Sequence, residues 1–309
     1  MAAMRWISAL LVLIGVLGNG TPSHAQSRAL MAWSASLNLI ALGIADQVRL
    51  HDGQTQQLLA VLEGAGATLT ALAWQPEGVL LATGDAEGRV CLWSGVDFTR
   101  QCSTSQGGAI RALAWQAEGA WLASAESERV RVWQVEPLVA RHEWSAEGVV
   151  TALAWQADRL AVGGALRGTY EQGFLALYNI QGSLQRRYLA EMRPPLSLQS
   201  LADDQLGVST PFEVFTWQSE TGRYVPLYLP LEEGESVRGV AWSPDGAQTL
   251  IVVGARLLCF AEGAPYSAVR LSASGLSLAW AAEGQLAALL TDDSSLYLIA
   301  AARCEVMQP

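Results

Sequence analysis

Short apolar runs ending in tryptophan recur along the chain at nearly constant spacing, and turn residues separate them. In one copy, Leu72–Trp74 is followed by Gln-Pro-Glu-Gly. Similar runs end at Trp33, Trp115, Trp155, Trp242 and Trp280. From Trp33 onward the steps are 41, 41, 40, 87 and 38 residues, so the step of 87 spans two periods. We therefore expect a degenerate copy within residues 196–216, with Gln199 in place of the tryptophan.

A second series of bulky residues follows the first by about 19 residues. Its members are His51, Trp93, Trp133, Tyr178, Trp217, Phe260 and Ile299, at steps of 42, 40, 45, 39, 43 and 39 residues. Two series with one period indicate seven units of about 40 residues. The expected units lie near 28–66, 67–107, 108–147, 148–191, 192–234, 235–273 and 274–309.

Each unit contains four short apolar runs separated by turn residues, which is typical of four antiparallel strands. Several runs are apolar on both faces, so each sheet must pack between two others, and the stack must close into a ring. The sequence thus predicts an all-β fold, a seven-bladed β-propeller; a β-sandwich or tandem domains are the alternative. The first unit begins with its inner strand near 29–33, and the last has its own outer strand near 302–306. We therefore expect the ring to close by side-chain packing alone.

Two segments carry a resemblance to the WD40 repeat family. Val240–Gly246 resembles the start of its repeat, and Leu81–Trp93 resembles the second half. The resemblance extends over residues 28–307 and implies a propeller that binds other proteins. Two features differ from the family pattern: no copy has the Gly-His pair, and Glu87 stands where the turn aspartate would be. We therefore expect the family's buried Ser/Thr-His-Asp-Trp hydrogen-bond network not to form.

Residues 1–25 have the features of a secretory signal peptide. Arg5 precedes an apolar run from Trp6 to Leu17, and Gly, Pro and a small-residue site ending at Ala25 follow. The apolar run is too short to span a bilayer. A core helix at the N-terminus is the alternative. We expect cleavage near Ala25 and a mature protein, residues 26–309, that is periplasmic or extracellular and not inserted in a membrane.

Charge and composition limit the possible functions. The 309 residues carry a net charge of −10, and all 19 basic residues are arginine. A chain without lysine has no Schiff-base or P-loop lysine, and the acidic balance argues against nucleic acid as a partner. Of the three histidines, we expect His51 to be packed and hydrogen-bonded and His142 to be exposed.

The sequence offers no grouping of residues with catalytic or metal-ligand spacing. We therefore expect no catalytic residue, no metal site and no cofactor. The function predicted is a non-enzymatic scaffold for protein–protein contacts, monomeric by itself. The alternative is a hydrolase or lyase acting on an extracellular sugar or ester through acids in the central channel.

The candidate partner-binding residues lie in loops between second and third strands. The loop through Gly163–Gly173 is four or five residues longer than its equivalents and contains Arg167, Tyr170 and Glu171. Exposed Tyr and Arg are favoured anchors in interfaces, although an insertion without a role is an equal alternative. Further candidates on the same face are Arg89, Arg129 and Arg256. On the opposite face an acid recurs in one turn, at Glu77, Glu118, Asp158, Asp245 and Glu283, and we interpret these acids as turn residues rather than as a ring for a basic partner.

Four cysteines in a chain expected to be exported suggest disulfides. Cys91 lies in a third strand and Cys102 in the fourth strand of the same hairpin, so the two are expected to face each other and could form a disulfide. Cys259 and Cys304 belong to different units, on strands that need not touch, and their pairing stays open.

Overall fold

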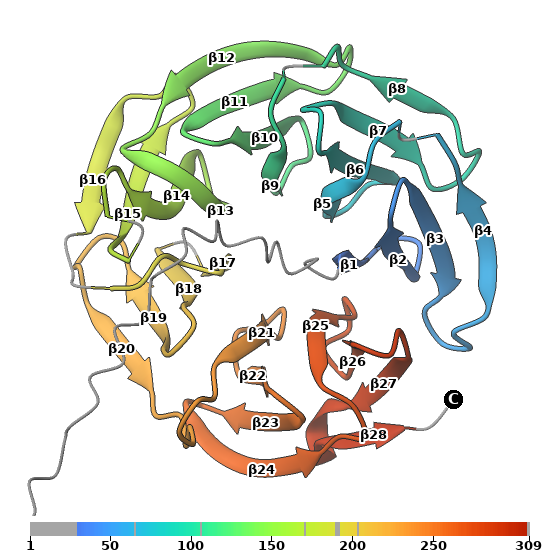
Figure 1. The fold of residues 1–309 in the computed structure, drawn as a ribbon, viewed down its shortest axis with the longest axis vertical. Helices are drawn as coiled ribbons and strands as arrows, with labels where there is room; N and C mark the ends of the chain where they lie inside the picture. Colours follow the sequence, from blue (N-terminus) through green and yellow to red (C-terminus); the bar gives the residue numbers. More distant parts are fainter. Residues whose placement is uncertain are drawn as a thin grey trace, which may run out of the picture.

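The computed structural model describes residues 30–64, 66–105, 107–169, 171–188, 192–202 and 204–307. Within these ranges the chain forms seven sheets of four strands, arranged as blades around a central axis (Figure 1). Each sheet consists of four consecutive strands, and neighbouring strands are antiparallel. The prediction of an all-β, seven-bladed propeller is confirmed.

The blades follow one another in chain order. Blades 1 to 4 contain β1 (Leu30–Trp33), β2 (Leu39–Ile44), β3 (Gln47–Asp52), β4 (Leu58–Leu62); β5 (Leu69–Trp74), β6 (Leu80–Asp85), β7 (Val90–Ser94), β8 (Arg100–Cys102); β9 (Ile110–Trp115), β10 (Trp121–Glu126), β11 (Arg129–Gln134), β12 (Val139–Ser145); and β13 (Gly148–Gln156), β14 (Arg159–Leu166), β15 (Gly173–Asn179), β16 (Leu184–Tyr188). Blades 5 to 7 contain β17 (Ser197–Ala202), β18 (Gln205–Ser209), β19 (Val214–Gln218), β20 (Tyr224–Leu227); β21 (Val237–Trp242), β22 (Gln248–Val253), β23 (Arg256–Ala261), β24 (Ala264–Arg270); and β25 (Gly275–Trp280), β26 (Leu286–Thr291), β27 (Leu296–Ala300), β28 (Glu305–Met307), with a 3₁₀ turn, η1 (Ala301–Arg303), before β28.

The two series of bulky residues occupy the same register in every blade except blade 5, which lacks the member of the first series. In blade 3, Leu122 of β10 lies opposite Trp115 on one side and Trp133 on the other. In blade 5 the equivalent residue, Leu206, lies opposite Trp217 and Ser200. Ser200, and not Gln199, therefore stands in place of the missing tryptophan. The sequence-based assignment was wrong by one residue because the pairing of β17 with β18 shifts between Ser200 and Ala202.

Gln199 instead joins blade 5 to blade 6 through hydrogen bonds of its side chain. Its side-chain amide donates to the Trp242 carbonyl at 3.0 Å and accepts the Trp242 backbone N–H at 3.3 Å. Two inner tryptophans join blades with their indoles instead, each to the preceding blade. Trp115 Nε1 donates to the carbonyl of Ala73 in blade 2 at 2.9 Å, and Trp155 Nε1 donates to that of Ala114 in blade 3 at 3.1 Å.

Apolar side chains fill the space between neighbouring blades. One buried cluster, for example, joins Val130 and Val132 of blade 3 to Trp155, Leu160 and Phe174 of blade 4. Both faces of a blade are thus withdrawn from water, which explains why its strands are apolar on both sides.

The buried hydrogen-bond network of the WD40 family forms in part, contrary to the expectation that it would not form. Trp93 Nε1 donates to Thr83 Oγ1 at 2.9 Å in blade 2, and Trp133 Nε1 donates to Ser124 Oγ at 2.8 Å in blade 3. The histidine is missing from the sequence, but the bond between the third-strand tryptophan and the second-strand hydroxyl needs only the register of these two strands. Two of the four partners therefore suffice for this bond.

In the described residues, blades 7 and 1 meet by side-chain packing. Met31, Trp33 and Ile40 of blade 1 form one buried cluster with Ala281 and Leu298 of blade 7. β28 supplies the fourth strand of blade 7 from the C-terminal part of the chain. The segments 1–25 and 26–29, to which the signal peptide and the start of the first inner strand were assigned, lie outside the described residues.

Candidate functional site

Loops of two kinds gather on one face of the ring. Because successive strands of a blade run in opposite directions, the loops between second and third strands share a face with the linkers that lead to the next blade. We call this face the loop face. The partner-binding candidates from the sequence belong to it.

The insertion in blade 4 lengthens strands as well as the loop. β13, β14 and β15 have nine, eight and seven residues, and the backbone N–H of Leu166 donates to the Gln172 carbonyl at 2.8 Å. Gly163–Leu166 therefore belongs to β14, and only residues 167–172 form the loop. The expectation of a long loop through Gly163–Gly173 is corrected, because the extra residues continue the antiparallel pairing.

The described residues of this loop contact neighbouring segments. Arg167 forms an ion pair with Glu128, in the turn between β10 and β11 of blade 3. A carboxylate oxygen of Glu171 lies 3.2 Å from Nη1 of Arg193, in the linker to blade 5. Both loop side chains are largely exposed, so the pairs tie the loop to its neighbours while leaving it accessible. Tyr170 lies outside the described residues.

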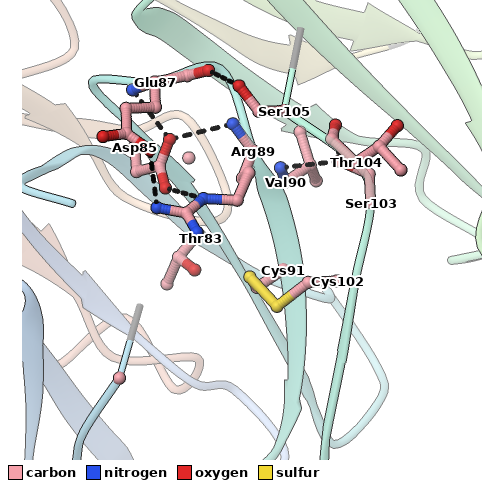
Figure 2. A network of polar contacts seen from close by, with 12 residues as sticks. Thr83, Asp85, Glu87, Arg89, Val90, Cys91, Cys102, Ser103, Thr104 and Ser105 are labelled. Carbon is pink, nitrogen blue, oxygen red and sulfur yellow. Dashed lines mark hydrogen bonds and ion pairs between the residues drawn. A yellow bond between two sulfur atoms is a disulfide. The ribbon is translucent and has the colours of Figure 1, made fainter. Parts of the chain in front are cut away.

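Arg89 is held inside its own turn in blade 2 (Figure 2). Its Nε lies 2.8 Å from Oδ2 of the buried Asp85, and one of its terminal nitrogens lies 3.0 Å from Glu87. Asp85 Oδ1 also accepts the backbone N–H groups of Glu87 and Arg89 at 2.9 and 2.8 Å. The arginine and the aspartate thus fix the loop between β6 and β7.

Arg129 and Arg256 also form ion pairs with acids of the propeller itself. Nε of Arg129 lies 3.4 Å from Glu143, on the outer strand of blade 3. Arg256 forms an ion pair with Glu235, in the linker to blade 6, and donates to the Pro230 carbonyl at 3.0 Å. A backbone hydrogen bond from Glu232, with Arg256 as a further cause, lowers the pKa of Glu235. These arginines shape the loop face through internal contacts.

Sequence reasoning missed two exposed aromatic residues on the loop face. Phe212, between β18 and β19, is 51% exposed, and Tyr228, at the start of the linker from blade 5 to blade 6, is 86% exposed. Since Val214 lies opposite Leu227, the two aromatics lie at the same end of the β19–β20 hairpin. The signal was present in the sequence, because a Phe directly after Pro211 and a Tyr at the start of the linker of residues 228–236 have no counterpart in the repeat.

On the opposite face, Asp245 acts as a turn residue. It accepts a hydrogen bond from the Ser243 hydroxyl and another from the Ala247 backbone N–H at 3.0 Å. These two bonds, the Ser243 bond first, lower the pKa of Asp245. The contacts of Asp245 therefore agree with the interpretation that this acid is a turn residue.

The central channel holds a cavity of about 220 Å³, lined by the first strands of six blades. Among the described residues that line it, Arg111 is the charged side chain, and none is Asp, Glu or His. Acids of different blades therefore do not converge at this cavity, as the hydrolase or lyase alternative would require. Throughout the described ranges, no three His, Cys, Asp or Glu side chains are grouped to hold a metal ion.

The two histidines of the described chain lie away from this channel, on blades 1 and 3. Nδ1 of His51 lies 2.9 Å from the Gln56 carbonyl, so this histidine is packed and hydrogen-bonded as expected. His142 is half-buried, with its ring centroid 6.2 Å from that of Trp121, and the expectation that it is exposed was wrong.

All four cysteines form disulfides in the structure. Cys91 and Cys102 lie directly opposite each other on β7 and β8 with Cα atoms 4.0 Å apart (Figure 2). Cys259 of blade 6 pairs with Cys304 of blade 7, whose Cα lies 6.1 Å away. The second bond joins two blades because η1 turns the chain and places the buried Cys304 against β23.

The structure describes no helix that is long and apolar enough to cross a membrane.

Comparisons with known proteins agree with the fold. A family model described as "Anaphase-promoting complex subunit 4 WD40 domain" matches residues 31–99, and one described as "WD domain, G-beta repeat" matches residues 98–134. No curated protein matches the chain. A chain from the structure "Crystal Structure of Mitotic Checkpoint Complex" is similar, with a TM-score of 0.74 and 16% identity over 88% of this chain and 90% of that chain. Residues 31–134 thus match models of WD40-type repeats, and the likeness to the solved structure shows the same fold around the ring. Propellers of the WD40 type typically serve as scaffolds for protein interactions.

Proposed function

We propose that this propeller is an exported, non-enzymatic scaffold that docks a partner protein on the loop face of blades 4 and 5. The observation that carries the proposal is the pair of exposed aromatics, Tyr228 and Phe212, at one end of the β19–β20 hairpin. Large aromatic side chains without an internal partner are the residues that most often anchor protein interfaces.

The surroundings of the two aromatics support a docking role. The neighbouring blade presents Arg167 and Glu171, and the linker between the blades presents Arg193. Exposed ion pairs contribute little to stability, so a partner can exchange them for its own contacts at small cost. A rim of charged side chains beside aromatic anchors has the composition of a protein interface.

Two observations support export. The sequence of residues 1–25 is typical of a signal peptide. In addition, all four cysteines are paired, and disulfides form and persist in oxidising compartments such as the periplasm and the extracellular space. The test of export is to fuse residues 1–25 to a reporter that is active only outside the cytoplasm. Reporter activity, with a mature N-terminus after Ala25, is the expected result, and an inactive cytoplasmic fusion would refute it.

The docking proposal is tested by comparing variants as bait in the exported fraction. The double variant Phe212→Ala, Tyr228→Ala should lose a partner that the wild type retains. The triple variant with alanine at Arg167, Tyr170 and Glu171 should bind that partner more weakly than the wild type does. Phe98→Ala is the matched control, because Phe98 is exposed in a turn on the opposite face. A partner that the double variant retains but Phe98→Ala loses would place the site on the face opposite the loop face and refute the proposal.

A further inference from the structure

Aromatic side chains of two blades meet at the outer part of the boundary between blades 4 and 5. The ring centroid of Tyr188, on β16, lies 5.4 Å from that of Trp217 on β19, and the ring centroid of Tyr224, on β20, lies 4.6 Å from that of Phe215. Trp217 and Phe215 are buried, whereas Tyr188 is half-buried and Tyr224 is 37% exposed. Because β16 and β20 are neighbouring outer strands of the ring (Figure 1), the two tyrosines are open to solvent at this boundary.

An acid accompanies these tyrosines. Glu213 directly precedes β19, and the alternation of side chains along a strand places it on the same side as Phe215 and Trp217. Burial raises the pKa of Tyr188 and Tyr224, and the charge of Glu213 raises the pKa of both further, so its carboxylate lies within electrostatic reach of the two hydroxyls. Glu213 is exposed, and among the described residues no hydrogen bond or ion pair reaches its carboxylate.

The boundary between blades 3 and 4 holds a similar group together with a cation. Trp144 of β12 and Tyr178 of β15 have ring centroids 5.7 Å apart. Burial raises the pKa of Tyr178 to about 12, Glu147 adds to the rise, and Arg187 opposes it. Nε of Arg187 donates to the Glu147 carboxylate at 2.7 Å. At this boundary the chain itself supplies a guanidinium for the acid beside the tyrosine.

In the part of the chain that the structure describes, no arginine takes the equivalent place beside Glu213. Arg186, also on β16, donates instead to the backbone carbonyls of Ser219 and Glu220. The acid beside the tyrosines of blades 4 and 5 therefore keeps an unneutralised charge, which a cation from outside the chain can complement.

We propose that this group binds an arginine side chain of the partner protein, with the guanidinium on the Glu213 carboxylate and against the rings of Tyr188 and Tyr224. A guanidinium is the cation best suited to both contacts, because it pairs with a carboxylate through two parallel hydrogen bonds and stacks on aromatic rings. The group adjoins the exposed Phe212, so it lies within the docking surface proposed above and rests on the function proposed for that surface.

A titration with N-acetyl-arginine methylamide tests this site without the partner. The tyrosine rings are labelled with ¹³C and observed by NMR, and the signals of Tyr188 and Tyr224 are assigned by replacing each residue with phenylalanine. Both signals should shift with the arginine probe and shift far less with the citrulline analogue, which has the same shape without the charge. The signal of Tyr178 should stay in place, because Arg187 already pairs with the acid there.

Glu213→Gln should weaken binding of the arginine probe about fivefold, because it removes the charge and keeps the shape of the side chain. Glu283→Gln is the matched control, since Glu283 is an exposed acid in a turn on the opposite face. It should bind the probe like the wild type. Tryptophan fluorescence of each variant confirms that it is folded.

Three outcomes would overturn the arginine site: signals of Tyr188 and Tyr224 that do not respond to the arginine probe, an equal response to the citrulline analogue, or an equal response in Glu213→Gln. The docking function fails by a different result, which is a partner retained by Phe212→Ala, Tyr228→Ala. Since the titration contains no partner, the two failures are distinguishable.

Discussion

Replacing Thr83 with valine removes the oxygen that accepts the indole hydrogen of Trp93 and leaves the shape of the side chain almost unchanged. Both residues are buried, and the bond between them is 2.9 Å long. Since valine fills the same volume, no cavity adds to the effect, and the cost is that of a buried N–H without a partner. That cost is about 1–3 kcal/mol. In a chain of 309 residues it lowers the melting temperature by about 1.5–2 °C per kcal/mol.

Blade 5 allows the reverse substitution. Val208 occupies in blade 5 the register position of Thr83, and in the described chain the buried Trp217 Nε1 has no hydrogen-bond partner. Val208→Thr supplies the missing acceptor at the same distance along the strand pair. It should raise the free energy of unfolding by about 0.5–1.5 kcal/mol.

Urea unfolding followed by tryptophan fluorescence measures both changes. As a control, Trp93→Phe removes the donor, so Thr83→Val should cost far less in that background than in the wild type. The reasoning is refuted if Thr83→Val leaves the wild-type stability unchanged, or if its cost is the same with and without the Trp93 indole.

Three further changes test other parts of the fold. Gln199→Leu removes the two hydrogen bonds to blade 6 and should cost about 1–3 kcal/mol in urea unfolding, with an unchanged value contradicting their role. Replacing both Cys259 and Cys304 with alanine opens a disulfide loop with a sequence separation of 45 and should cost about 4 kcal/mol by the loop-entropy relation, measured the same way. For Asp245, the Ser243 hydrogen bond lowers the pKa in the folded state, so its stabilisation is present above the ordinary pKa and is lost as pH falls through the folded value. Asp245→Asn should therefore be less stable than the wild type at neutral pH and equal to it in strong acid, as measured by urea midpoints across pH.

The period of the sequence was sufficient to predict the architecture, because each unit repeats one pair of anchors. Trp115 and Trp133 mark the first and third strands of blade 3, and the same spacing in other blades leaves room for one short strand between them. The irregular blade was harder to predict. In blade 5 no tryptophan marks the first strand, and a register shift after Ser200 moves the repeat by one residue, which spacing alone does not reveal.

The site was only partly predictable, because it depends on contacts between blades. A sequence shows that Arg89 and Arg256 lie near the connection between a second and a third strand, but not that Asp85 and Glu235 already hold them. The partner of Cys304 was equally hidden, because the 3₁₀ turn before it decides which neighbouring strand the thiol meets. Local patterns predict elements, whereas side-chain partners depend on how separate units pack.

Because the arginines of the loop face are already paired with acids of the propeller, they can contribute little free energy to the binding of a partner protein. Arg89 and Arg256 each contact acids that fix their own loops, so a partner that used them would have to replace existing ion pairs. The exchange of one ion pair for another gives little net affinity. The ring of Tyr228, in contrast, is almost fully exposed, so covering it removes apolar surface from water without breaking an internal contact. The loop face should therefore bind mainly through its aromatics, with the charged loops setting the orientation of the partner.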